Sequence, residues 1–118
     1  MANCQTGHDF TGRSTDPGTF IINTHNLQGI ELVQRFTPSG CHGLPAPVAV
    51  LGAGVVSSDL YAESEQLGVI ITGPFASSIG VAGGFSLGGG AGGPFQPVFG
   101  MGTDSRLFLS TQVQPELT

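Results

Sequence analysis

A glycine-flanked histidine lies near the start of the sequence, in the stretch TGHDFTGRST at residues 6–15. A histidine side chain can act as a nucleophile, a proton carrier or a metal ligand. Gly7 and Gly12 let the backbone turn and approach a ligand closely, and the hydroxyls of the stretch can bind polar groups. These residue types predict a loop that holds a ligand next to His8.

A metal is one ligand to consider, because Cys4, His8, Cys41 and His42 carry the donor atoms of a zinc site. The adjacent pair Cys41 and His42 rarely binds one tetrahedral ion together. The sequence also lacks both a Cys-x-x-Cys and a His-x3-His spacing. We therefore predict no metal site. The two cysteines could form one disulfide or remain free thiols, and the sequence leaves both possibilities open.

A dinucleotide is a second candidate, since Gly52-x-Gly54 lies between a predicted strand and a predicted helix. The motif is incomplete, because Ser57 occupies the third glycine position and no acidic residue ends the next apolar run, at 69–72. We therefore favour a structural role for these glycines, as small residues that permit close packing, over a dinucleotide site. A phosphate-binding P-loop is excluded because the chain has no lysine, and no serine lies in a Gly-x-Ser-x-Gly elbow.

The second half of the chain is rich in glycine: residues 79–104 hold half of the 20 glycines. Apolar residues such as Val81, Phe85 and Leu87 are interleaved with them at a density that disordered glycine linkers lack. An ordered surface on which the backbone approaches a flat or anionic ligand is favoured over a low-complexity tail.

The elements that must position these residues are short. A turn signal, Asp-Pro-Gly, occupies residues 16–18, and a loop rich in proline and glycine occupies 37–47. Runs of β-branched and aromatic residues predict strands at 20–24, 31–36, 48–55, 69–73 and 107–111.

One helix is predicted near residues 58–67. Ser57 or Ser58 can cap its start, and Gly68 stands just past its end. The 3.6-residue period assigns four residues to its inner face: Leu60, Tyr61, Ser64 and Leu67. The fold class is α+β, with mostly short strands, this one helix and a glycine-rich loop region.

The composition limits the partners. With 118 residues the chain is one small domain or a piece of one, and its net charge of −5 leaves no basic patch for nucleic acid or anionic lipid. The longest weakly polar run, 69–87, is interrupted by Pro74 and by glycines, so no transmembrane segment is predicted. The first residues have no secretory signal pattern, and the sequence leaves the localisation unknown.

Five blocks together resemble a known family. In this order they are TGHDFTGRST, THNLQGI, AVLGAGVVSSDLYAE, SSIGVAGGFSLGGGAGG and FGMGTD. They are similar to the PCMH-type FAD-binding domain of the FAD-linked oxidases related to berberine bridge enzyme. These belong to the wider vanillyl-alcohol-oxidase type, and the variant resembles its fungal branch. The resemblance covers residues 6–104, and several blocks in order are far more specific than one glycine motif.

The resemblance implies a cofactor, FAD, and the residues that hold it. His8 matches the histidine that the family bonds covalently to the flavin. Four residues match a first wall of the family's flavin site: Thr6, Gly7, Gly12 and Ser14. Eight residues match a second wall: Ile79, Gly80, Val81, Gly83, Gly84, Gly88, Gly89 and Gly90.

The chain departs from the family at two positions near the flavin. Many members carry a cysteine that makes a second flavin bond, and Ala76 stands there; Ala91 replaces a histidine in the family's GGGHG run. The resemblance therefore implies a single covalent link, through His8.

The implied activity is oxidation of a small organic substrate by hydride transfer to the flavin, with oxygen as the acceptor. The resemblance assigns no catalytic residue. In the family, a strand-helix-strand subdomain precedes the histidine loop and a substrate lobe follows the glycine-rich region. We therefore expect residues 1–118 to form a single partial FAD-binding domain that binds flavin weakly, or not at all, and lacks activity by itself.

The alternative is a non-catalytic, glycine-rich interaction protein without a bound cofactor. In either case unpaired strand edges would favour self-association.

Overall fold

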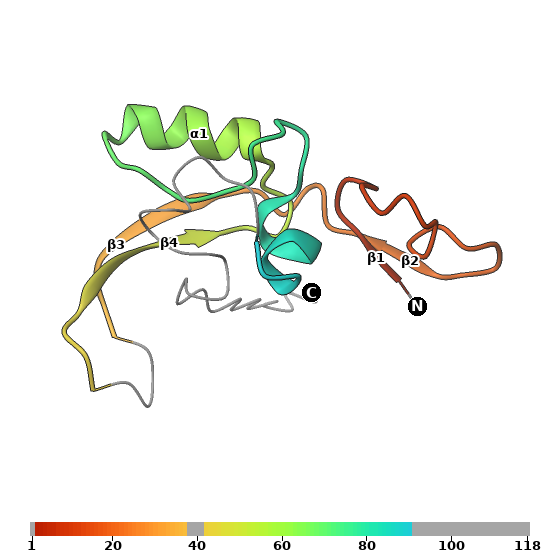
Figure 1. The fold of residues 1–118 in the computed structure, drawn as a ribbon, viewed down its shortest axis with the longest axis horizontal. Coiled ribbons are helices and arrows are strands. Elements are labelled where there is room, and N and C mark those ends of the chain that lie inside the picture. Colours follow the sequence, from red (N-terminus) through yellow and green to blue (C-terminus); the bar gives the residue numbers. More distant parts are fainter. Residues whose placement is uncertain (1, 38–41, 91–118) are drawn as a thin grey trace, which may run out of the picture.

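The structure is a computed structural model that describes residues 2–37 and 42–90. Its elements, in chain order, are strands β1 (Ala2–Cys4), β2 (Ile21–Asn23), β3 (Ile30–Phe36) and β4 (Ala46–Leu51), helix α1 (Ser57–Gln66) and one π-helical turn, η1 (Val81–Phe85). Within these residues, short strands and a single α-helix confirm the α+β class (Figure 1).

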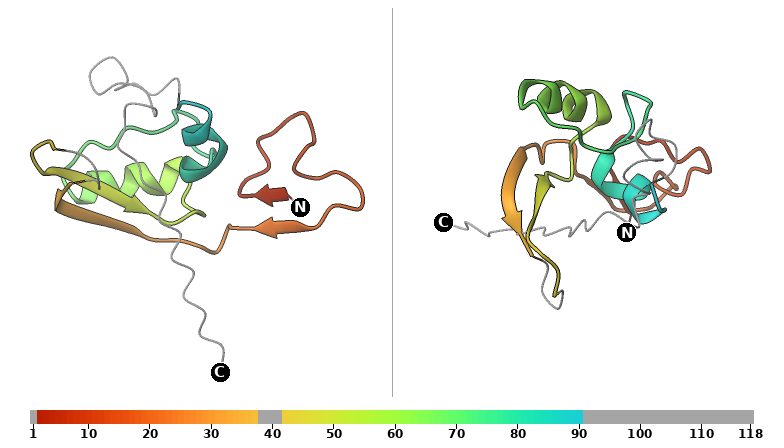
Figure 2. Two further views of the ribbon diagram at one scale, coloured as in Figure 1. Left: turned by 90° about the horizontal axis from the view of Figure 1, so that it is seen from below. Right: turned by 60° about the vertical axis from the view of Figure 1, so that its left-hand side comes forward.

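The strands form two separate pairs. β3 and β4 are antiparallel, with Val33 opposite Val48, and α1 lies beside this ribbon (Figure 1). β1 and β2 are parallel, with Cys4 opposite Asn23, and the long loop between them extends away from α1 (Figure 2). The predicted strands at 20–24 and 31–36 are confirmed. The sequence did not reveal β1, because three residues before a loop carry no periodic signal.

A small core joins the second half of the fold. Val55, Leu60 and Val81 are buried, and Ile30, Leu51 and Ile71 pack against them. Val55 comes from the β4–α1 connection, Leu60 from α1 and Val81 from η1, so the core holds these three segments together.

The serine cap predicted for α1 is wrong. Val56 is the cap residue, and the cap has no side-chain hydrogen bond. The Ser57 N–H donates to the Ile79 carbonyl at 3.0 Å, and the Ser58 N–H donates to the Ser77 carbonyl at 3.0 Å. A distant loop therefore satisfies the free amides at the start of the helix.

The predicted end of the helix is confirmed. Gly68 has φ +65°, its N–H donates to the Glu65 carbonyl at 3.1 Å, and the Val69 N–H donates to the Ser64 carbonyl at 3.0 Å. This is the Schellman arrangement. On the predicted inner face Leu60 and Ser64 are buried and Tyr61 is half-buried, whereas Leu67 is exposed.

Two predicted strands differ from the structure. Residues 69–73 form no strand, because the described residues provide no hydrogen-bonded neighbour for them. β4 covers Ala46–Leu51 rather than 48–55, since the chain turns at Gly52 and Gly54. The predicted strand at 107–111 lies outside the described residues.

No helix in residues 2–37 and 42–90 has the length and apolar character needed to cross a membrane.

Candidate functional site

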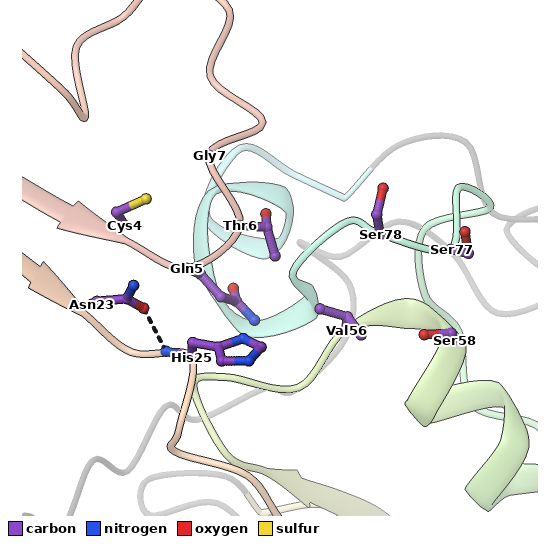
Figure 3. A pocket seen from close by; sticks show the side chains of 10 residues that line it. All are labelled: Cys4, Gln5, Thr6, Gly7, Asn23, His25, Val56, Ser58, Ser77 and Ser78. Atoms are coloured by element: carbon purple, nitrogen blue, oxygen red, sulfur yellow. Dashed lines mark hydrogen bonds between the residues drawn. The ribbon is translucent and has the colours of Figure 1, made fainter.

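A cavity of about 630 Å³ lies where the N-terminal loop, the end of β2 and the segment after α1 meet (Figure 3). Its volume is within the range of about 300–1,000 Å³ that small-molecule sites occupy. Ten residues line it: Cys4, Gln5, Thr6, Gly7, Asn23, His25, Val56, Ser58, Ser77 and Ser78.

The first wall comes from the loop after β1. Thr6 and Gly7 line the cavity, and Gly7 has φ +73°, a left-handed conformation that favours glycine. His8 follows directly. Its Nε2 forms a 3.0 Å hydrogen bond with Ser78 Oγ, and the tautomer of the ring decides which atom donates. The predicted histidine loop is thus joined to a residue 70 positions away in the chain.

A polar cluster stabilises the loop just after His8. Asp9 accepts hydrogen bonds from the N–H and the hydroxyl of Thr11, at 3.0 and 2.6 Å, and from Arg13 Nε at 3.0 Å. These bonds, first that of the Thr11 hydroxyl and then that of Arg13, lower the pKa of Asp9 to about 2. The loop next to His8 is therefore fixed by its own side chains.

The second wall comes from the segment between α1 and η1. Ser77 and Ser78 line the cavity, and Ile79 and Gly80 follow them. The Ile79 carbonyl is occupied, because it accepts hydrogen bonds from both the N–H and the hydroxyl of Ser57. Gly80 is buried next to Gln5.

Of the predicted site residues, Thr6 and Gly7 line the cavity. His8, Ile79 and Gly80 are not in the lining, but His8 contacts the lining residue Ser78, and Ile79 and Gly80 follow Ser78 in the chain. The remaining predicted residues also lie outside the lining: Gly12, Ser14, Val81, Gly83, Gly84, Gly88, Gly89 and Gly90.

The glycines after the second wall have structural partners of their own. The N–H groups of Gly88, Gly89 and Gly90 donate to the carbonyls of Gly84, Ser86 and Phe85, at 2.9, 3.1 and 2.8 Å. Gly89 and Gly90 have positive φ, as the turn after a helical segment requires. The amides predicted to face an anion are therefore engaged within the segment itself.

Val81 and Gly12 are also accounted for by the fold. Val81 is buried in the core, and its N–H donates to the Val55 carbonyl at 3.0 Å. Gly12 has φ +80° and accepts a hydrogen bond from the Thr15 N–H at 2.9 Å, so it forms a turn in the loop.

Sequence reasoning named two of the ten lining residues, Thr6 and Gly7, as site residues. Asn23 and His25 come from the end of β2, and the Asn23 side chain accepts the His25 N–H at 2.9 Å (Figure 3). Asn23 precedes the block THNLQGI and His25 lies within it, and the place of this block directly after a strand was the available signal. Gln5 and Ser58 had no local signal, since only the folded chain brings them to the cavity.

The structure explains the Gly52-x-Gly54 motif without a dinucleotide. A Cβ at Gly52 would overlap with the Leu27 carbonyl, and one at Gly54 would overlap with the His25 carbonyl. The N–H groups of Ser57 and Ser58, where a phosphate would bind, already donate to the 77–79 segment. The preference for small residues that pack closely is confirmed.

The residues proposed as metal donors do not assemble in the part of the chain that the structure describes. Within it, no three His, Cys, Asp or Glu residues are grouped so that they could hold a metal ion. Cys41 lies outside the described residues, and so does the possible disulfide with Cys4.

Known proteins resemble this chain over most of its length. It is 40% identical over 102 residues to aurantioclavine synthase cnsA of Penicillium expansum. The aligned region covers 86% of this chain and 22% of that protein. The chain is 39% identical over 102 residues to the FAD-linked oxidoreductase penH of Penicillium thymicola, and here the aligned region covers 86% of this chain and 18% of that protein. No protein-family model matches the chain.

A solved structure has the same fold. The VAO-type flavoprotein MtVAO615 from Myceliophthora thermophila C1 superimposes with a TM-score of 0.76 and 30% identity, over 86% of this chain and 18% of that one. The chain corresponds in sequence and fold to one part of the VAO-type FAD-linked oxidoreductases. It spans about a fifth of the length of the relatives it matches.

FAD is the cofactor of this family, and the cavity suits part of it. None of its ten lining residues is acidic, although the whole chain carries a net charge of −5. Hydroxyl donors come from Thr6, Ser58, Ser77 and Ser78, and the His25 imidazole adds a further polar group. The lining thus offers neutral donors and no carboxylate, which is the chemistry that an anionic diphosphate or a polar ring edge needs.

Proposed function

We propose that this chain supplies two walls of the flavin site of a FAD-linked oxidoreductase. The whole protein would oxidise a small organic substrate by hydride transfer to the flavin, with oxygen as the acceptor. The observation that supports the proposal best is the 3.0 Å contact between His8 Nε2 and Ser78 Oγ, because it joins the two walls at one cavity. The bound flavin supplies the redox chemistry, and the protein binds and orients it.

His8 is the proposed covalent attachment point. A neutral imidazole has one N–H and one nitrogen lone pair. Nε2 is engaged with Ser78 whichever of the two groups donates, and the described residues provide no hydrogen bond for Nδ1. Nδ1 would then bind the flavin. The link would be single, because Ala76, on the second wall, has no reactive group.

The remaining predicted residues support the site from a distance. Gly12 and Ser14 would shape the loop that carries His8. Val81 would anchor the second wall in the core, and the glycines Gly83, Gly84, Gly88, Gly89 and Gly90 would give the segment after it a compact path.

The isolated 118-residue chain should bind FAD weakly and should not turn over substrate. The cavity is open to solvent, and the core that the described residues form is small. No catalytic acid or base is assigned within it.

Chemical-shift mapping tests the proposal, because it detects weak ligands. FAD should shift the backbone signals of residues 6–8 and 77–80 at much lower FAD concentrations than the signals of β3 and β4. After long incubation with FAD, any flavin that survives acid precipitation should disappear in His8→Ala and persist in His42→Ala. His8 contacts the lining residue Ser78, whereas His42 has no hydrogen bond to a lining residue among the described residues. Shifts confined to other segments would contradict the proposed site.

A non-catalytic interaction protein is the second candidate. Large apolar side chains are exposed on the described residues, among them Phe10 at 98%, Leu44 at 88% and Phe75 at 73%. Apolar groups exposed to this degree favour association. This candidate predicts no response of residues 6–8 and 77–80 to FAD.

A further inference from the structure

We propose that Gln5 is a positioning residue, whose side-chain amide sets the spacing between the two walls of the cavity and so holds His8 against Ser78. The relevance of Gln5 to flavin binding rests on the function proposed above. The contacts of Gln5 described below are observed independently of that function.

The Gln5 amide is fixed to the core. Its Nε2 donates to the Val55 carbonyl at 2.7 Å, across 50 positions of sequence. Val55 is 1% exposed, and the same carbonyl accepts the Val81 N–H at 3.0 Å. Gln5 therefore connects the loop of the first wall to the point where the β4–α1 connection meets η1.

The same amide lies directly on the second wall. A Cβ placed on Gly80 would overlap with the Gln5 amide, which provides the three nearest heavy atoms. A Cβ on Gly83 would lie 3.2 Å from Gln5 Oε1. Gly80 has φ −70° and ψ 125°, a backbone that any residue adopts, so the reason for glycine there is the space that Gln5 fills.

The position of Gln5 in the chain couples it to His8. Gln5 lies three residues before His8, and Gly80 lies two residues after Ser78. Two side-chain hydrogen bonds thus tie the first wall to the second half of the fold, Gln5 to Val55 and His8 to Ser78. The second of these is exposed, and an exposed hydrogen bond alone holds a loop weakly. Gln5 is the partly buried tie that makes the His8 contact persist.

Histidine ring 15N spectra of the FAD-free chain test this role. Wild type should show His8 in one tautomer, and Gln5→Ala should change its ring signals toward those of the exposed His42. Gln28→Ala is the matched control. Its Nε2 also donates to backbone carbonyls, those of His25 and Gly54, but it does not touch the first wall. Unchanged His8 signals in Gln5→Ala, or equal changes in both variants, would overturn the proposal.

A second pair of variants decides the matter if Gln5→Ala folds poorly. Gly80→Ala should lower the urea midpoint, because the new methyl group meets the Gln5 amide. In that background Gln5→Ala should raise the midpoint, whereas in wild type it should lower it. Gly73→Ala is the control background, since a Cβ there would meet Leu60 instead. If Gln5→Ala lowered the urea midpoint equally in wild type, Gly80→Ala and Gly73→Ala, direct packing of Gln5 against Gly80 would be excluded.

Titration with FAD separates this proposal from the proposed function. Gln5→Ala should weaken FAD binding by roughly three- to tenfold, the effect of one hydrogen bond, while Gln28→Ala should stay within about twofold. If wild type binds no FAD but the spectra change as expected, the function fails and the positioning role stands. Equal FAD binding by wild type and Gln5→Ala, with unchanged spectra, would remove the positioning role and leave the function intact.

Discussion

Ser57 donates both its backbone N–H and its side-chain hydroxyl to the carbonyl oxygen of Ile79, each at 3.0 Å. Ser57 is fully buried at the start of α1, and Ile79 belongs to the second wall of the cavity. Ser57 thus makes two of the hydrogen bonds that join the helix to this wall, beside the one from the Ser58 N–H to the Ser77 carbonyl. The hydroxyl that sequence reasoning assigned to a local cap serves a contact across 22 positions instead.

Replacing that hydroxyl should destabilise the fold modestly. Ser57→Ala leaves the Ile79 carbonyl with the N–H bond alone, so the free energy of unfolding should fall by about 1 kcal/mol. Urea unfolding followed by circular dichroism measures the change. Ser58→Ala, whose side chain is exposed, should alter the free energy by less than about 0.5 kcal/mol. Similar losses in the two variants would contradict a special role for Ser57.

The reach of the sequence patterns explains which elements could be predicted. The end of α1 was predictable because Gly68 completes its hydrogen bonds within five residues of chain. Gly52 and Gly54 were also interpreted correctly as packing residues, although the groups that exclude a Cβ there, the Leu27 and His25 carbonyls, come from the distant segment after β2.

The missed features depend on contacts that are distant in sequence. Three of them join segments that are far apart in the chain. They are the parallel pairing of Cys4 with Asn23, the capping of α1 by the carbonyls of Ser77 and Ile79, and the approach of Gln5 and His25 to one cavity. The apolar run at 69–73 shows the opposite error. Its β-branched residues suit a strand, but propensity makes no strand without a neighbour to pair with.

Stability should depend on pH through Asp9. Its pKa falls from 3.8 to about 2 because Thr11 and Arg13 donate to its carboxylate. A group whose folded-state pKa is depressed contributes stability above its unfolded pKa and loses it as pH falls through the folded value. The urea midpoint should therefore decrease between about pH 4 and pH 2. Asp9→Asn should make this decrease smaller, and an identical pH profile in the variant would show that Asp9 contributes nothing.

The core should tolerate little truncation. Leu60 is fully buried and packs with Val55 and Val81. Leu60→Ala should cost about 2–5 kcal/mol, which in so small a core is enough to unfold the chain at room temperature. Leu67→Ala is the matched control on the same helix, because Leu67 is 42% exposed. Amide exchange of α1 measures the outcome, and protection retained in Leu60→Ala would contradict this account of the core.

Exposed apolar groups should make the isolated chain associate. Phe10 and Phe75 are 98% and 73% exposed, and each is an aromatic group that water solvates poorly. Light scattering should report a mass that rises with concentration. Phe10→Ser with Phe75→Ser should reduce this rise, whereas Arg35→Ser, which changes an exposed charged residue, should not. A chain that stays monomeric at high concentration would contradict the prediction.

Two neighbouring serines allow the His8 contact to be tested with little other change. Ser77 and Ser78 both line the cavity, but only Ser78 has its hydroxyl on His8 among the described residues. Ser78→Ala should let the His8 ring sample both tautomers and should weaken FAD binding by roughly three- to tenfold. Ser77→Ala removes a similar hydroxyl from the same wall, while its backbone carbonyl still accepts the Ser58 N–H. It should leave the His8 ring signals unchanged. If the two variants lose FAD affinity equally and neither alters the His8 signals, the wall contributes hydroxyl groups in general, and Ser78 has no particular part in orienting His8.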